Sequence, residues 1–117
     1  SYENKQSLMS LCDMYGEIDI IQSAKESFSY LEATQNFMED LEGLAEKLIY
    51  KSGLILHVDL GEVQGFKYHN GVVFSAYADS AGYVLAKGGR YDGLRKQSDR
   101  DRPAVGFDLD LVSVSNL

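Results

Sequence analysis

The chain has 117 residues, of which 44% are hydrophobic and 25% are charged, and it carries a formal net charge of −7. This length suits one domain or part of one, and no apolar run approaches the roughly 18 residues that span a bilayer. The acidic balance argues against general nucleic-acid affinity, which needs a basic surface, and one cysteine excludes an internal disulfide or a zinc cluster. We therefore expect a cytoplasmic protein that holds no metal.

Charge is distributed unevenly along the chain. Residues 1–62 carry twelve acids against four lysines, whereas residues 63–117 carry six acids against seven bases, including every arginine. A solvated helical surface packed on a sheet explains most of this asymmetry. The second half could still hold one anion.

The first two helices are predicted from apolar spacing. Residues 8–15 place their apolar side chains on one helical face, which would bury Cys12, and Gly16 would end this helix. A buried thiol is usually inert packing, so we expect no nucleophilic role for Cys12. A second, shorter helix begins at Ile18 and fades near Phe28.

The strongest helical pattern covers residues 36–51. Asn36 followed by Glu39 resembles a capping box, and Gly53 is a suitable end. The apolar stripe of this helix consists of Phe37, Leu41, Leu44 and Leu48, flanked by Met38, Ala45 and Ile49. Such a stripe is more typical of a helix that covers a core than of a ligand pocket.

A strand is predicted at Leu54–Asp59, where His57 and Asp59 share one face. A histidine and a carboxylate two residues apart could act as an acid-base pair. No motif places a serine or cysteine nucleophile beside them, which favours the alternative, a polar or partly buried face.

A hairpin with both faces covered is predicted for residues 71–87. Its first strand, residues 71–78, is uncharged and rich in β-branched and aromatic residues, residues 79–82 supply a turn, and residues 83–87 return. Gly88 and Gly89 then allow a sharp turn or the close approach of a ligand. Polar aromatic side chains stand beside the glycines at both ends of the hairpin, namely Tyr68 and His69 before it and Tyr91 after it. This composition suits a small polar ligand.

The last predicted elements are a short helix that becomes a polar loop over residues 94–101 and a strand over residues 104–111. Helices followed by strand segments favour an α+β fold with an antiparallel sheet and packing helices. We expect a single domain over residues 1–117, mainly helical over 1–53 and mainly β over 54–117.

Three blocks, residues 65–74, 88–94 and 103–107, resemble the histidyl-tRNA synthetase family in order and spacing. In that family the first two blocks are histidine-specific motifs, and the third opens motif 3 of the class II synthetases. The resemblance implies the C-terminal part of a class II synthetase-like catalytic core. It also implies a histidine-binding pocket whose residues are Tyr68, His69, Gly88, Gly89, Tyr91 and Gly106.

The chain departs from the active enzymes at the positions that handle ATP. Gln64 stands where they have an arginine, and Asp110 and Ser113 stand where motif 3 closes with a glycine and an ATP-binding arginine. Amide and hydroxyl groups cannot offset phosphate charge as a guanidinium does, so we expect no catalytic residue and no cofactor.

These departures, together with His69 and the run at residues 59–62, resemble the non-catalytic paralogue of the synthetases. That paralogue is the regulatory subunit of ATP phosphoribosyltransferase in histidine biosynthesis, which assembles with the short-form catalytic subunit and supports its feedback inhibition by histidine. Motifs 1 and 2 do not occur in this sequence, so we expect exposed sheet edges, self-association and weak or no histidine binding by the chain alone. The alternatives are a fragment of an active synthetase and a domain that has lost its ligand.

Overall fold

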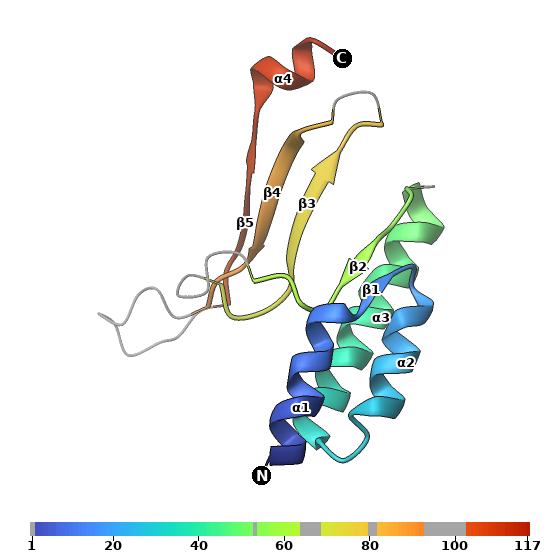
Figure 1. Cartoon of the computed structure of the whole chain (residues 1–117). Helices are drawn as coiled ribbons and strands as arrows, with labels where there is room; N and C mark the ends of the chain where they lie inside the picture. Colours follow the sequence, from blue (N-terminus) through green and yellow to red (C-terminus); the bar gives the residue numbers. More distant parts are fainter. Residues whose placement is uncertain (1, 53, 64–68, 80–81, 93–102) are drawn as a thin grey trace, which may run out of the picture. The chain divides into compact units, whose positions relative to one another are not determined.

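The computed structural model describes residues 2–52, 54–63, 69–79, 82–92 and 103–117. The chain folds into two compact units, Ser1–Glu62 and Val63–Leu117. The first is mainly helical and the second is mainly an antiparallel sheet (Figure 1). This confirms the predicted α+β class. Over the ranges just given, no helix is both long enough and apolar enough to cross a bilayer.

The first unit is built from helices joined by one short strand pair. Its elements are α1 (Tyr2–Ser10), the 3₁₀ turn η1 (Leu11–Asp13), β1 (Tyr15–Gly16), α2 (Asp19–Ser27), α3 (Glu32–Ser52) and β2 (Val58–Asp59). β1 and β2 are antiparallel, with Tyr15 opposite Asp59, and the N–H of Leu60 donates to the carbonyl of Met14 at 2.9 Å. The strand pair therefore connects the segment before α2 to the segment after α3.

The core of the first unit lies between α2 and α3, which run side by side in Figure 1. Its buried side chains are Ile21, Ala24, Phe28, Met38, Ala45 and Val58. Ile21 and Ala24 of α2 and Phe28, which directly follows this helix, are spaced by three and four residues, as one helical face requires. Two polar contacts support this packing: Lys25 pairs with Glu42, and the Nε2 of Gln35 donates to the carbonyl oxygens of Lys25 and Phe28 at 3.0 and 3.1 Å.

The structure corrects the predicted first helix. α1 ends at Ser10, and the chain tightens into η1, in which the N–H of Met14 donates to the carbonyl of Leu11 at 3.1 Å. Leu11 and Met14, three residues apart, both contact the core. Cys12 lies between them and is exposed, so its predicted burial is wrong. The reason is that a 3₁₀ turn has three residues per turn, which directs the intervening side chain outward.

The second helix is confirmed, whereas the third begins earlier than predicted. α3 starts at Glu32, where the N–H groups of Thr34 and Gln35 donate to the carbonyl of Leu31, so the capping box at Asn36 is wrong. The first turn of α3 is mainly polar, so the periodic spacing of apolar residues predicts only the later turns of this helix. Only part of the stripe is buried: Met38 and Ala45 belong to the core and Leu41 packs against it, whereas the remaining leucines and Phe37 are 38–42% exposed.

The predicted strand at residues 54–59 is reduced to β2. Leu54 and Ile55 lie outside any strand and are exposed. His57 is exposed as well, and Asp59 Oδ1 accepts the N–H of Gly61 at 2.9 Å, which uses the carboxylate for a local turn. This contact favours the polar-face alternative over an acid-base pair.

The second unit is a three-stranded antiparallel sheet followed by a short helix. Its elements are β3 (Val73–Tyr77), β4 (Val84–Arg90), β5 (Val105–Leu109) and α4 (Leu111–Ser115), and the strand order is β3-β4-β5. The β3–β4 hairpin is confirmed, with a register shift between Ala76 and Tyr77. The predicted helix and loop over residues 94–101 lie outside the described residues.

Two further corrections concern this sheet. The hairpin is not covered on both faces, because Phe74 is 44% and Tyr77 is 64% exposed. An uncharged strand composition indicates β structure but cannot distinguish a covered face from an open one. The last strand ends at Leu109, because Asp110 begins α4 and Leu111 lies inside that helix.

Replacing Phe28 by alanine tests the core between α2 and α3. Phe28 is fully buried, so Phe28→Ala should lower the free energy of unfolding by about 3–5 kcal/mol. Tyr50 on α3 is 91% exposed and is the control, since Tyr50→Ala should change stability by about 0.5 kcal/mol or less. Urea denaturation followed by circular dichroism measures both. Equal midpoints for the two variants would contradict this assignment of the core.

Candidate functional site

The candidate site is centred on two glycines that face each other across β4 and β5. Gly89 pairs with Gly106, and directly opposed residues of antiparallel strands point to the same side of the sheet. A methyl group added at Gly89 would lie 2.8 Å from Cδ2 of His69 and 2.9 Å from the carbonyl oxygen of Val72. One added at Gly106 would lie 2.8 Å from the hydroxyl oxygen of Tyr91. The two rings therefore occupy the space that glycine leaves free.

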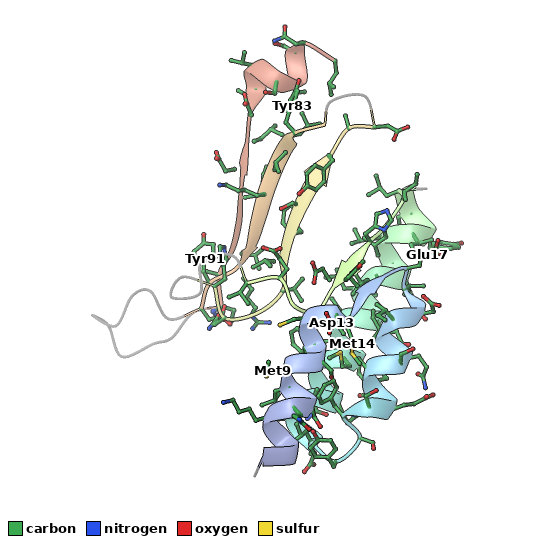
Figure 2. The ribbon with its side chains drawn as sticks, viewed as in Figure 1. Met9, Asp13, Met14, Glu17, Tyr83 and Tyr91 are labelled. Carbon is green, nitrogen blue, oxygen red and sulfur yellow. The ribbon has the colours of Figure 1, made fainter. Side chains whose placement is uncertain are left out.

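The structure thus brings together four of the predicted site residues: His69, Gly89, Tyr91 and Gly106. Tyr91 follows β4 directly, and its N–H donates to the carbonyl of Ala104 at 2.9 Å, which ties it to the start of β5. Figure 2 shows Tyr91 at this end of β4 and Tyr83 at the opposite end. Tyr68 lies outside the described residues.

Gly88 is placed on the other face of the sheet. Successive strand residues alternate in direction, and a methyl group at Gly88 would lie 2.8 Å from side-chain atoms of Phe74 and Phe107 and 2.4 Å from the carbonyl oxygen of Gly106. Gly88 therefore allows the two strands and the side chains of Phe74 and Phe107 to pack closely. It gives no access to the face that carries Tyr91. Both glycines lie inside β4, so the predicted sharp turn at this point is wrong.

Polar groups continue the glycine face along the sheet. In the strand register, Lys87 lies opposite Ser75 on β3 and opposite Asp108 on β5. Each of these three residues is two positions along its strand from the row that contains Gly89. Their side chains therefore point to the same side of the sheet as Gly89. Lys87 and Asp108 are exposed. The face thus offers an aromatic ring, an imidazole, an ammonium group and a carboxylate, which are suited to a small zwitterionic ligand.

Sequence reasoning missed two residues next to the rings, Asn70 and Asp92. Asn70 follows His69 and Asp92 follows Tyr91, and the side chains of both make hydrogen bonds to backbone groups of other segments. The available signal was their residue type, since Asn and Asp beside strand ends commonly bond to the backbone.

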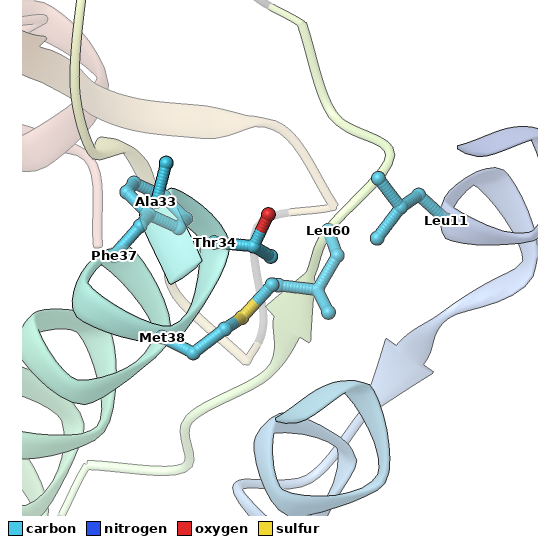
Figure 3. Close-up of a pocket in the computed structure, with 6 residues that line it drawn as sticks. All are labelled: Leu11, Ala33, Thr34, Phe37, Met38 and Leu60. Atoms are coloured by element: carbon cyan, nitrogen blue, oxygen red, sulfur yellow. The ribbon is translucent and has the colours of Figure 1, made fainter. Parts of the chain in front are cut away.

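The first unit also contains a hollow, which is a poorer candidate. It has a volume of about 280 Å³ and is lined by Leu11, Ala33, Thr34, Phe37, Met38 and Leu60 (Figure 3). Thr34 supplies the one hydroxyl group among these side chains, so the hollow cannot orient a charged ligand. Within the described ranges, no three His, Cys, Asp or Glu side chains gather as a metal site would require.

Asp110 and Ser113, where the sequence resemblance leads us to expect a glycine and an ATP-binding arginine, form a helix cap. Asp110 Oδ1 accepts the N–H groups of Val112 and Ser113 at 3.1 and 3.0 Å, and its Oδ2 accepts the hydroxyl of Ser113 at 2.7 Å. These bonds, chiefly the backbone and side-chain bonds from Ser113, hold the pKa of Asp110 below its usual value of 3.8. The two residues therefore bind each other and begin α4. Gln64, the third departure, lies outside the described residues.

Comparison with known proteins assigns the family. The family model for histidyl-tRNA synthetase matches residues 1–114. The chain belongs to the histidyl-tRNA synthetase family.

Within this family the chain is similar to proteins named ATP phosphoribosyltransferase regulatory subunit. The protein of that name from Polynucleobacter asymbioticus is 38% identical over 114 residues, and the one from Ralstonia pickettii is 36% identical over 104 residues. These matches cover 94% and 89% of this chain but 29% and 26% of the relatives. The chain thus spans less than a third of the length of these relatives.

A solved structure is similar to this chain and carries the names of both the regulatory subunit and the synthetase. The crystal structure of an ATP phosphoribosyltransferase regulatory subunit/histidyl-tRNA synthetase from Bacillus halodurans superimposes with a TM-score of 0.73 and 29% identity. The match covers 98% of this chain and 31% of that one. The α+β fold is therefore that of a synthetase-like protein.

Substitution of single glycines distinguishes the glycine that leaves room for the Tyr91 ring from the one that the strand packing requires. Gly106→Ala should displace the Tyr91 ring, whereas Gly88→Ala should separate β4 from β5 and cost about 1–3 kcal/mol, because the backbone carbonyl that it meets cannot move aside. Gly43→Ala on α3, where the added methyl meets nothing within 4 Å, should stabilise the chain by up to about 1 kcal/mol. Urea denaturation and the NMR signals of the Tyr91 ring distinguish these outcomes. A Gly106→Ala variant with unmoved Tyr91 signals would refute the proposed contact.

The cap of α4 should depend on pH. The pKa of Asp110 is lower in the folded chain than in the unfolded one, so its contribution to stability is complete above pH 3.8 and is lost as the pH falls through the lowered value. The protection factor of the Ser113 amide, which is the intrinsic exchange rate at each pH divided by the rate observed by NMR, should fall between pH 5 and pH 2. Asp110→Asn keeps a side-chain acceptor that does not titrate, and it should remove most of this loss of protection.

Proposed function

We propose that the chain is the C-terminal part of the synthetase-like core of an ATP phosphoribosyltransferase regulatory subunit. In this role it performs no chemistry of its own and supports the activation and the histidine feedback of a catalytic subunit in histidine biosynthesis. Its partners are the short-form catalytic subunit, a second copy of the protein and L-histidine, and it acts in the cytoplasm. Residues 1–117 together form one part of that core.

One contrast carries this proposal. The face with His69, Gly89, Tyr91 and Gly106 keeps an arrangement suited to a small polar ligand, whereas Asp110 and Ser113 hold a mutual cap where an active synthetase carries a glycine and an arginine. A carboxylate cannot neutralise a polyphosphate, so the ATP half of the site has lost its function while the amino-acid half remains. The names of the similar proteins agree with this contrast.

The histidine imidazole suits the aromatic side of this face. A tyrosine hydroxyl can donate to or accept from an imidazole nitrogen, and ring faces provide flat apolar contact. Lys87 and Asp108, one row further along the same face, carry charges complementary to the carboxylate and ammonium of an amino acid. The glycine pair with its rings thus suits the imidazole of histidine, and Lys87 and Asp108 suit its carboxylate and ammonium groups.

The edges of the described sheet support association. β3 and β5 are the outer strands of the order β3-β4-β5, so one edge of each has no neighbouring strand within the described sheet. A strand from another part of the core or from a second copy could be added at either edge. We therefore expect the fragment alone to associate and to bind histidine weakly.

The test uses the full-length protein that carries this segment, together with its catalytic subunit. Saturating L-histidine at about 100 times its dissociation constant should stabilise the regulatory subunit by about 2.7 kcal/mol in thermal unfolding. Tyr91→Ala should abolish this shift and should also reduce histidine inhibition of the complex. Tyr83→Ala, at the other end of β4, is the matched control and should retain both.

A second measurement excludes an active synthetase. Histidine-dependent exchange of pyrophosphate into ATP should be absent in the full-length protein, because the ATP-binding cations are replaced. Measurable exchange would overturn the regulatory assignment. Absence of both exchange and a histidine-induced shift would instead indicate a domain that has lost its ligand.

A further inference from the structure

The side-chain amide of Asn70 forms one accepted and one donated hydrogen bond with the backbone of Asp92, as the backbone of a neighbouring strand would. Its Oδ1 accepts the N–H of Asp92 at 2.9 Å, and its Nδ2 donates to the carbonyl of Asp92 at 3.1 Å. The backbone N–H of Asn70 donates in addition to the carbonyl of Arg90 at 3.0 Å. The segment that follows His69 is thus fixed to both residues that flank Tyr91.

The side chain of Asp92 continues this connection to the third strand. Its Oδ1 accepts the N–H of Ala104, immediately before β5, at 2.8 Å, and its Oδ2 pairs with Nε of Arg90. The bond from Ala104 and then the Arg90 side chain hold the pKa of Asp92 below its usual value, so the carboxylate is charged at neutral pH. The Asp92 side chain is 24% exposed. One residue therefore ties together the ends of all three strands.

These bonds bracket the two rings of the candidate site. His69 directly precedes Asn70, and Tyr91 lies between Arg90 and Asp92, so rotation of either segment would move a ring away from the glycine pair. We propose that Asn70 and Asp92 are positioning residues that hold His69 and Tyr91 over Gly89 and Gly106. Their importance for ligand binding rests on the proposed function, whereas the placement of the rings does not.

The first arm of the test measures ring placement in the 117-residue chain without ligand. In the wild type, NMR should show a nuclear Overhauser contact between the Tyr91 ring and the Hα atoms of Gly106. Asp92→Ala and Asn70→Ala should each weaken this contact. Asp92→Asn keeps an oxygen that can accept the Ala104 N–H and should retain most of it. Asp79→Ala, an exposed aspartate beyond β3, is the control and should leave it unchanged.

NMR contacts between the backbones of β4 and β5 show whether a variant still forms the sheet, and so distinguish a positioning role from a purely structural one. The β4–β5 ladder does not involve Asn70, and Asn70→Ala also keeps the backbone bond from residue 70 to Arg90, so the strand pairing should persist while the Tyr91 contact weakens. An unchanged Tyr91 contact in this variant would overturn the inference. Loss of the strand pairing together with the ring contact would also overturn it, because the role would then be structural alone.

The second arm measures L-histidine affinity by calorimetry in the full-length protein. Asp92→Ala removes the bonds to Ala104 and Arg90 that position the rings and should weaken binding by about tenfold, and Asp92→Asn should recover most of this loss. Wild-type affinity in a variant whose ring contact is lost would refute the positioning role. If the wild type itself does not bind histidine, the proposed function fails, and the first arm alone decides the placement of the rings.

Discussion

The absence of side chains at the paired residues Gly89 and Gly106 is the constraint on which the candidate site depends. Any Cβ at these two positions would enter the space of the His69 or Tyr91 ring. Because the glycines are paired in register, the two rings share one face rather than opposite faces. Gly88 serves a different purpose one residue earlier, since it lets the backbone of Gly106 approach from the other side. Three glycines thus serve two faces of one sheet.

The sequence predicted the types of most elements because their signals are local. β-branched and aromatic residues on either side of a turn predicted the β3–β4 hairpin, and apolar periodicity predicted α2 and most of α3. The errors arose where the outcome depends on other parts of the fold. Cys12 is exposed because η1 changes the helical period, and Phe37, Leu44 and Leu48 form an apolar stripe on an exposed side of α3. Neither fact is encoded in periodicity.

The candidate site was predictable in its residue types but not in its geometry. The motif resemblance named Gly88, Gly89, Tyr91 and Gly106 together, yet only the register separates Gly88 from the others. The roles of Asn70 and Asp92 also depend on contacts between segments that are 22 residues apart for one bond and 12 for another. From the sequence, the Asp110–Ser113 pair indicated only that an expected arginine is missing, and the structure shows that these residues form a helix cap.

The glycines have a thermodynamic consequence for the strands that contain them. Glycine loses more backbone entropy on folding than other residues, by roughly 0.5–1 kcal/mol relative to alanine in a strand, and it provides no side chain for cross-strand contact. Three such residues meet where β4 and β5 pair. Local opening of this sheet should therefore begin at the same place where the rings lie, and a molecule held against those rings would restrain it.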